Sequence, residues 1–229
     1  MQVDGSLKRL WQEHRLIEQV LATLDDACQA LRRGMPPDPR FFLDAVDFVR
    51  TFADGWHHGR DERQLLPLLE ECGVSHEYVP VDRVLDDHRH GRAYVGLMAA
   101  AAARLGEGSR LAVADFIGGA SLYTALLRRH IALEDRTLYP LATAVLEPGA
   151  RLELAECFAD EERRLGVGTP RRYRELAESL ARRLGLMLAL ERGGGAGWAR
   201  RASPAPVFAP QSGEYAPTVP ALADQLRAR

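Results

Sequence analysis

Two short segments of this chain carry a histidine, a carboxylate and a proline at the same spacing. In each segment the carboxylate follows the histidine by four residues and precedes the proline by six. Residues four apart on a helix share a face, so each segment would direct an imidazole and a carboxylate toward one point. Both groups are common ligands of transition-metal ions. The two segments are His57-x-x-x-Asp61 before Pro67 and His130-x-x-x-Glu134 before Pro140.

A single histidine precedes each of these repeated segments by almost the same interval. His14 lies upstream of His57, and His88 lies upstream of His130. Two helices with the repeated segments and two with the single histidines would together supply four imidazoles and two carboxylates. That set suits a pair of transition-metal ions, with iron first among them.

His57 is followed directly by a second histidine, so the inward-facing residue has to be chosen. Neighbouring residues on an α-helix are about 100° apart, and only one of the two is expected to face the core. The residues behind His57 are apolar and those behind His58 are polar. This favours the pair His57 and Asp61 over the pair His58 and Glu62. The second pair stays an alternative, because a proline-induced kink can shift the helical phase. The two stripes are Ala53, Val49 and Val46 behind His57, and Asp54, Thr51 and Asp47 behind His58.

The same reasoning selects one histidine from the three that follow. His88 comes after Val81 and Leu85 on an apolar stripe, whereas His90 comes after charged residues and is expected to face solvent. His76 lies near a glycine in a connection and is interpreted as solvent-exposed. Only His88 therefore enters the candidate set.

The candidate residues are harder to explain as a set than one by one. Any single inward histidine is most simply a hydrogen-bonded core side chain. Two unpaired carboxylates in an apolar bundle would each cost several kcal/mol, and a cation between them would remove that cost. We therefore predict a buried metal site formed by His14, His57, Asp61, His88, His130 and Glu134.

Helices with apolar stripes are needed to position these residues, and the first part of the chain predicts four of them. The first covers residues 6–31, and Asp38 with Pro39 forms the cap and first turn of the second. The third begins near Val81, and Ser109 caps the fourth. No segment alternates with a period of two. Short connections between four helices predict an all-α fold, an up-down-up-down four-helix bundle.

Two further helical stretches are predicted after the bundle, over residues 151–165 and 171–190, and are expected to cover or extend it. After Arg192, consecutive glycines and scattered prolines favour an irregular tail. The predicted organisation is a bundle over residues 1–148, a helical extension over 149–192 and a Gly/Pro-rich tail over 193–229.

The composition is that of an ordinary soluble globular protein. Hydrophobic residues make up 46% of the 229 residues, charged residues make up 27%, and the formal net charge is -2. This charge gives no general attraction to nucleic acid, and charged residues interrupt every apolar stretch before it could span a membrane. The first ten residues lack the apolar core of a secretion signal. We expect a cytoplasmic protein with reduced thiols at Cys28, Cys72 and Cys157.

With these residues assembled, the chain resembles the hemerythrin family, and within it the bacterial hemerythrin-like proteins with an HHE cation-binding domain of the four-histidine type. The resemblance covers about residues 7–146 and implies a four-helix bundle with a non-heme di-iron centre. The motifs that carry it are Glu13-His14, His57-x-x-x-Asp61 before Leu66-Pro67, Asp87-His88-x-x-Gly91-Arg92, and His130-x-x-x-Glu134 before Tyr139-Pro140.

The resemblance implies a role for each candidate residue. The histidines would be terminal ligands, and the carboxylates would bridge two iron ions together with an oxide or hydroxide. Zinc or manganese could replace iron, because sites of imidazole and carboxylate accept several ions. The terminal ligands would be His14, His57, His88 and His130, and the bridging ligands Asp61 and Glu134.

One position departs from the oxygen-carrying hemerythrins, which have a second histidine four residues after the first on the third helix. Here that position is Arg92, and the residue four before His88 is Val84, so a fifth imidazole is expected to be missing. About two of the twelve coordination positions of two octahedral irons would then stay open. Open positions on a redox metal favour chemistry over plain oxygen carriage.

These features lead to the hypothesis of a non-heme di-iron protein that binds and transforms dioxygen, peroxide or nitric oxide. The alternative is an iron- or oxygen-sensing or storage module without turnover, and the sequence does not decide whether the protein is an enzyme. The expected partner is a small diatomic molecule or peroxide, without nucleic acid or membrane. The oligomeric state is open, with a homodimer as one option. Glu18 and Tyr123 lie near the candidate residues, with structural roles at least as well supported.

Overall fold

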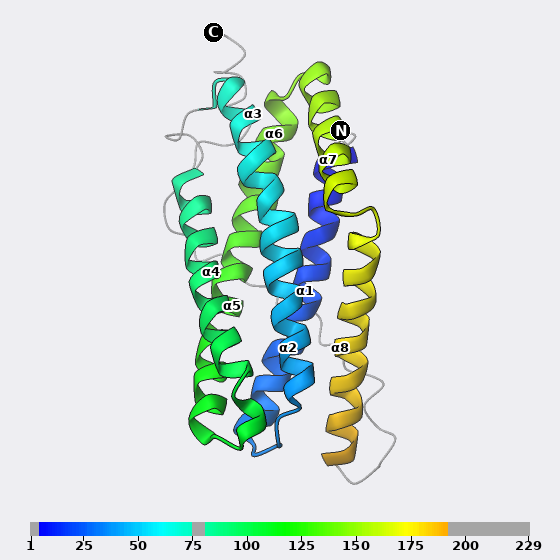
Figure 1. Ribbon diagram of the computed structural model, residues 1–229. Coiled ribbons are helices and arrows are strands. Elements are labelled where there is room, and N and C mark those ends of the chain that lie inside the picture. The colour runs from blue at the N-terminus through cyan, green and yellow to red at the C-terminus, as the bar shows by residue number, and fades with distance from the viewer. Residues whose placement is uncertain (1–4, 75–80, 192–229) are drawn as a thin grey trace.

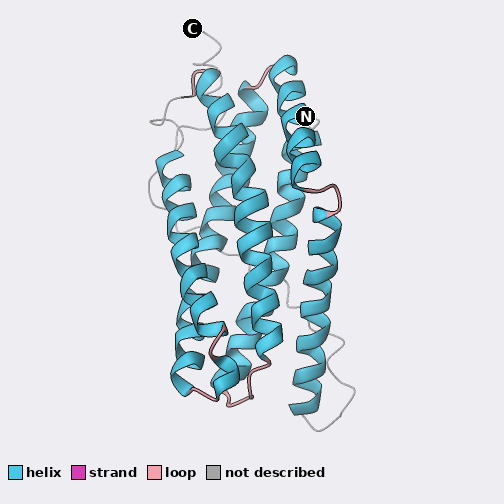
Figure 2. Cartoon of the chain, in the orientation of Figure 1, coloured by secondary structure: helices cyan, strands magenta, loops and turns pink. Residues whose placement is uncertain are grey.

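The computed structural model describes residues 5–74 and 81–191, and its elements within these ranges are all helical (Figure 1, Figure 2). Four helical rods lie side by side, each reversing the direction of the one before, so the predicted all-α bundle is confirmed. The second and fourth rods contain π-helical segments (η1, η2 and η4), and a short 3-10 helix (η3) follows the third. The first rod is α1 (Gly5–Arg32), the second α2 (Pro39–Asp47), η1 (Phe48–His58), η2 (Asp61–Leu65) and α3 (Leu66–Glu71), the third α4 (Val81–Ala102) with η3 (Leu105–Glu107), and the fourth α5 (Arg110–Leu133), η4 (Glu134–Leu138) and α6 (Tyr139–Val145).

The predicted starts of the second and fourth rods are confirmed by their capping hydrogen bonds. Asp38 accepts a hydrogen bond from the backbone N–H of Phe41 at 3.3 Å, and Pro39 occupies the first turn. Ser109 accepts a hydrogen bond from the backbone N–H of Ala112 at 3.2 Å. Both rods that carry a repeated segment therefore begin where the sequence places them.

The two repeated segments share a backbone irregularity as well as their side chains. The N–H of Leu66 bonds the carbonyl of Asp61, and the N–H of Tyr139 bonds the carbonyl of Glu134. Each bond closes a π-helical turn directly before a proline. In a regular α-helix the proline ring would collide with the carbonyl four residues earlier. The wider π-helical turn lets each rod continue beyond its proline, as α3 and α6.

A polar layer separates two apolar clusters along the bundle. On α1, Leu10 belongs to one cluster and Ile17 to the other, and His14 lies between them. The same order holds on the other rods, so all the candidate residues lie in this layer. The apolar residues on either side of the layer are Trp56 and Leu65 on the second rod, Val84 and Val95 on the third, and Leu127 and Leu138 on the fourth.

Both stretches predicted after the bundle are helical, as α7 (Pro148–Leu165) and α8 (Thr169–Glu191), and both contact α1 (Figure 1). On α8, Tyr173 is buried in the larger apolar cluster, and on α7, Phe158 is buried in the smaller one. The extension therefore continues the core of the bundle. The predicted tail over 193–229 and His76 lie outside the described residues.

The helical stretch from Arg110 to Val145 is the one stretch within residues 5–74 and 81–191 that could cross a membrane, judged by length and hydropathy alone. Several of its apolar residues, among them Phe116 and Leu127, are buried in the core of the bundle. Packing against the other rods accounts for the apolar character of these buried residues.

Candidate metal centre

The six residues predicted as ligands all lie in the polar layer and are at most 1% exposed. All four rods contribute, so residues far apart in the chain converge on one centre. Their assignment as metal ligands stays a prediction. They are His14 on the first rod, His57 and Asp61 on the second, His88 on the third, and His130 and Glu134 on the fourth.

His14, His57 and Glu134 form one group of potential ligands, and their ligand atoms all lie within 4.8 Å of one another. Nε2 of His14 is 3.0 Å from Oε2 of Glu134, and Nε2 of His57 is 4.0 Å from the same oxygen. Tyr139 stacks on His14, and its hydroxyl lies 3.3 Å from both His14 Nε2 and Glu134 Oε2. We call the part of the centre around His14 and His57 the two-imidazole side.

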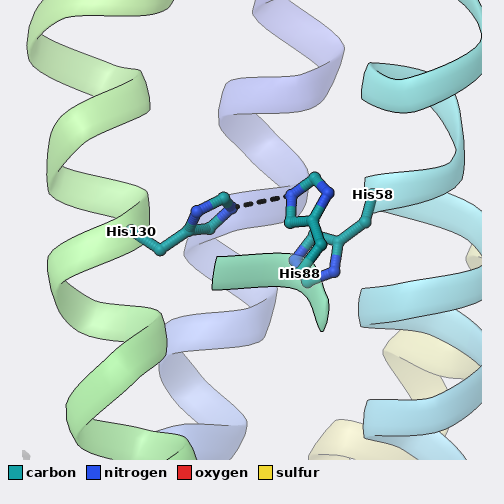
Figure 3. A group of neighbouring side chains, drawn as sticks. All are labelled: His58, His88 and His130. Atoms are coloured by element: carbon teal, nitrogen blue, oxygen red, sulfur yellow. Dashed lines mark hydrogen bonds between the residues drawn. The ribbon is translucent and has the colours of Figure 1, made fainter. Parts of the chain in front are cut away.

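His58, His88 and His130 form a second group, whose ligand atoms also lie within 4.8 Å of one another. Figure 3 shows the three rings facing one another from three different rods. Nε2 of His88 is 3.2 Å from Nε2 of His130, and the ring of His58 stacks on that of His88 with 4.0 Å between centroids. We call this part the three-imidazole side.

The position of His58 shows that the sequence-based choice between the adjacent histidines was wrong in part. His58 is only 2% exposed, so both His57 and His58 face the interior. The choice assumed a regular α-helix, whereas Phe48–His58 is π-helical and its turns are wider. Two neighbouring residues about a quarter of a turn apart can also both face a broad centre, one toward each side.

The position of a second histidine on α4 is Arg92, as the sequence indicated, and no fifth imidazole comes from that helix. A fifth buried imidazole, that of His58, lies at the centre from the second rod, and whether it is a ligand stays a prediction. Arg92 instead donates hydrogen bonds to Asp54 Oδ1 at 2.8 Å and to Glu62 Oε1 at 2.7 Å. Oε1 of Glu62 in turn lies 2.8 Å from Nδ1 of His88. The centre therefore contains five imidazoles.

Asp61 and Glu134 lie between the two sides. The ligand atoms of Asp61, His88 and Glu134 are all within 4.8 Å of one another. Oδ2 of Asp61 is 3.7 Å from Nε2 of His57, and Oε2 of Glu134 is 3.4 Å from Nε2 of His130. Each carboxylate is near imidazoles of both sides, as a bridging ligand has to be.

Several polar atoms at the centre are buried and have no hydrogen-bond partner among the residues that the structure describes, including both oxygens of Asp61 and Nε2 of His57. Burial, together with the charge of Glu134, raises the pKa of Asp61 well above its ordinary value. Burial also acts to raise the pKa of Glu134, but the imidazoles of His130 and His14 outweigh it and lower that pKa. Buried acceptors without partners are costly. A cation between them would give each a partner, so the donor set fits a bound metal.

The outer ring nitrogen, Nδ1, of all five imidazoles lies near a carboxylate. Metal-bound histidines usually have such a partner, which fixes the tautomer and orients the other nitrogen toward the metal. Some of these acids are close to a histidine in the sequence, and others lie on a neighbouring rod. Acidic residues near histidines are too common in a sequence for this pattern to identify the acids as partners of ligands. The pairs are Asp135 with His14 (2.7 Å), Glu13 with His57 (3.0 Å), Asp54 with His58 (3.6 Å), Glu62 with His88 (2.8 Å) and Asp87 with His130 (3.8 Å).

Replacement of His58 by alanine is expected to weaken the binding of one of the two ions and to leave the other unchanged. The three-imidazole side would lose one of its imidazoles and keep His88 and His130, whereas the two-imidazole side would not be altered. Metal analysis after dialysis against increasing concentrations of a chelator measures the change, because one ion should be lost at a lower chelator concentration than in the wild type. His90→Ala is the matched control, because His90 is an exposed histidine on α4. If both ions of His58→Ala resist the chelator as they do in the wild type, His58 is excluded as a ligand.

Comparison with known proteins agrees with this arrangement. Residues 5–142 match the family described as "Hemerythrin HHE cation binding domain". Uncharacterized proteins of Mycobacterium bovis and Mycobacterium tuberculosis are 23% identical to the chain over 155 residues, which cover 68% of this chain and 60% of each relative. The chain therefore matches less than two thirds of these relatives. No solved structure gives a significant match.

Proposed function

This chain belongs to the hemerythrin HHE cation-binding family, and on that premise we propose that its buried centre holds two iron ions and binds a small oxidant. One ion would lie on the two-imidazole side and the other on the three-imidazole side. Asp61 and Glu134 would bridge them, because each lies near imidazoles of both sides. The substrates in keeping with such a centre are dioxygen, peroxide and nitric oxide.

The observation that carries the proposal is the unequal division of five imidazoles about two carboxylates in one buried layer. The three-imidazole side has one protein donor more than the two-imidazole side. A small ligand would therefore have room on the two-imidazole side, where the protein supplies fewer donors. The asymmetry supports binding of an external molecule at one defined place.

The chemistry divides between the metal and the chain. Bound iron would supply electrons to the oxidant by cycling between its ferrous and ferric states. The chain excludes bulk water, because an apolar cluster lies on each side of the polar layer. Tyr139 places its hydroxyl on the two-imidazole side, within 3.3 Å of Glu134 Oε2, where it can donate a hydrogen bond. Asp135, Glu13 and Glu62 lie within hydrogen-bond distance of Nδ1 of His14, His57 and His88, and they keep the inner nitrogen of these three imidazoles directed at the centre.

A second candidate function is iron or oxygen sensing, or storage, without turnover. It is favoured by a buried ion pair between Arg60, which lies between the two ligands His57 and Asp61, and Glu161 on α7. Through this contact the occupancy of the centre could affect a helix outside the bundle. The cytoplasmic location and the lack of nucleic-acid and membrane partners remain proposals based on composition.

Metal analysis and an optical spectrum of protein that is reduced without oxygen and then re-oxidised test the proposal. We expect about two irons per chain. Steady consumption of peroxide or nitric oxide by the iron-loaded protein would support turnover. Saturable binding without consumption would favour sensing, and progressive uptake of many irons would favour storage. A protein that takes up only zinc or manganese would contradict the iron assignment.

A further inference from the structure

Helix α7 lies beyond the segment that matches the family, yet part of it is buried against the rod that carries His57 and Asp61. Phe158 is 1% exposed and Glu161 is 4% exposed, although Glu161 is charged. Glu161 accepts a hydrogen bond from Gln64 at 3.2 Å and pairs with Arg63 and Arg60. A buried carboxylate on an added helix needs such partners, and all three lie on the second rod.

The side chain between the two helices is Arg60, which is completely buried. Its guanidinium lies 4.1 Å from the ring centroid of Trp56 and 4.9 Å from that of Phe158. Its Nε lies 3.7 Å from Oε2 of Glu161. Two aromatic rings and the carboxylate of Glu161 therefore surround this cation on the side that faces α7, which supplies one of the rings and the acid.

Arg60 in turn determines the position of the carboxylate behind His57. Its Nη1 donates a hydrogen bond of 2.6 Å to Oε1 of Glu13, and Nε1 of Trp56 donates one of 2.8 Å to the same oxygen. The other oxygen of Glu13 is 3.0 Å from Nδ1 of His57. An unbroken series of contacts therefore leads from Glu161 to a candidate ligand.

From this series we infer that α7 is a positioning element of the metal centre, acting through Arg60 and Glu13 on the imidazole of His57. The inference rests on the proposed iron centre. Its effect is confined to the two-imidazole side, where His57 lies. The carboxylates behind the three-imidazole side belong to the second and third rods, and the partners found for Asp54, Glu62 and Asp87 are bundle residues.

Glu161→Gln tests this inference because it removes the charge that α7 presents to Arg60 and keeps the size of the side chain. Glu156→Gln is the matched control, since Glu156 is an exposed glutamate on the same helix. Iron-loaded full-length proteins are mixed with a strong chelator, and the release of the two irons is followed over time. In Glu161→Gln one of the two irons is expected to leave about tenfold faster. Changes to residues that support a metal ligand usually have an effect of this size on metal binding. Glu156→Gln is expected to release both irons like the wild type.

A second pair of variants keeps the test valid if Glu161→Gln fails to fold. Phe158→Leu removes the aromatic face beneath Arg60, and Leu154→Ala removes apolar contact from the same helix and the same cluster without touching Arg60. Faster release of one iron in Phe158→Leu but not in Leu154→Ala supports positioning, as does recovery of slow release in Glu161→Asp. If Phe158→Leu and Leu154→Ala release their irons at the same rates, α7 contributes only to the stability of the fold, and the inference is overturned. A wild type that holds no iron would overturn the proposed function as well, which separates the two failures.

Discussion

Glu134→Gln is expected to abolish iron binding on both sides of the centre. Oε2 of Glu134 lies 3.0 Å from Nε2 of His14 and 3.4 Å from Nε2 of His130, so one oxygen serves both groups of imidazoles. Glutamine has the same shape but no charge, and an amide is a much weaker ligand for iron than a carboxylate. The iron content should fall from about two ions per chain to nearly none. This loss is larger than the loss expected for His58→Ala, because Glu134 belongs to both sides.

Metal analysis of the desalted protein and its visible absorption after re-oxidation measure the effect of Glu134→Gln. Glu107→Gln is a suitable control, because Glu107 is exposed and lies in the 3-10 helix after α4, away from the polar layer. Circular dichroism shows whether the helices remain. A helical variant with the full iron content would show that the carboxylate of Glu134 does not bind metal, and the bridging role would have to be abandoned.

The repeated segments explain why so much of the centre could be predicted from the sequence. A histidine and a carboxylate four residues apart, twice, each with a proline at a fixed distance, are local features of the chain. Apolar stripes then show which face is buried, so His14 and His88 could be chosen without knowing any contact. The caps at Asp38 and Ser109 are equally local.

His58 could not be predicted by the same reasoning, because its position depends on a π-helical backbone and on the width of the centre. Counting in steps of about 100° gives the wrong face wherever the helix departs from α geometry. Asp54, one turn before His58, also made that stripe look solvated. In the structure the carboxylate of Asp54 lies 3.6 Å from Nδ1 of His58 and accepts a hydrogen bond from Arg92. Its charged group therefore faces the centre and not bulk solvent.

The contacts of α7 lie beyond local reasoning for a different reason. Nothing in the sequence around Glu161 relates it to Arg60, since the two residues are about a hundred positions apart in a chain with many glutamates and arginines. Only packing decides which of the many possible pairs forms. Arg60 lies between His57 and Asp61 in the sequence and is fully buried. It does not belong to an apolar stripe, and arginine is usually exposed, so the sequence alone would place it in solvent.

Removal of the metal is expected to destabilise the fold strongly, because the polar layer is costly without a cation. A ligand present at about a thousand times its dissociation constant stabilises the folded state by about 4 kcal/mol. For a protein of this size each kcal/mol shifts Tm by about 2–4 °C, so chelation should lower Tm by about 8–16 °C. Thermal unfolding with and without chelator measures the shift. The double variant His57→Ala, His130→Ala should unfold at the same temperature in both conditions. A metal-free helical interaction domain would instead show no change in the wild type.

The pH dependence of this difference is a sharper test, because protons and metal compete for the same groups. Burial acts to lower the pKa of His14, but hydrogen bonds to Asp135 and Glu134 outweigh it and raise the pKa to about 9 in the metal-free protein. A raised histidine pKa stabilises the folded metal-free protein below pH 6.5, and that contribution is lost as the pH rises to about 9. The raised pKa of Asp61 acts in the same direction, because its folded form also holds an extra proton.

The metal-bound protein holds neither the extra proton of His14 nor that of Asp61. Its stability should therefore not decrease between pH 6.5 and pH 9 through the loss of these protons. The difference in Tm between iron-loaded and chelated protein should therefore widen between pH 6.5 and pH 9. His14→Ala, which removes the titrating imidazole, should show a weaker change across that range. A difference that narrows with rising pH would mean that protons do not compete with the metal at His14. In that case metal binding would displace no proton from His14, and the assignment of His14 as a ligand on the two-imidazole side would have to be abandoned.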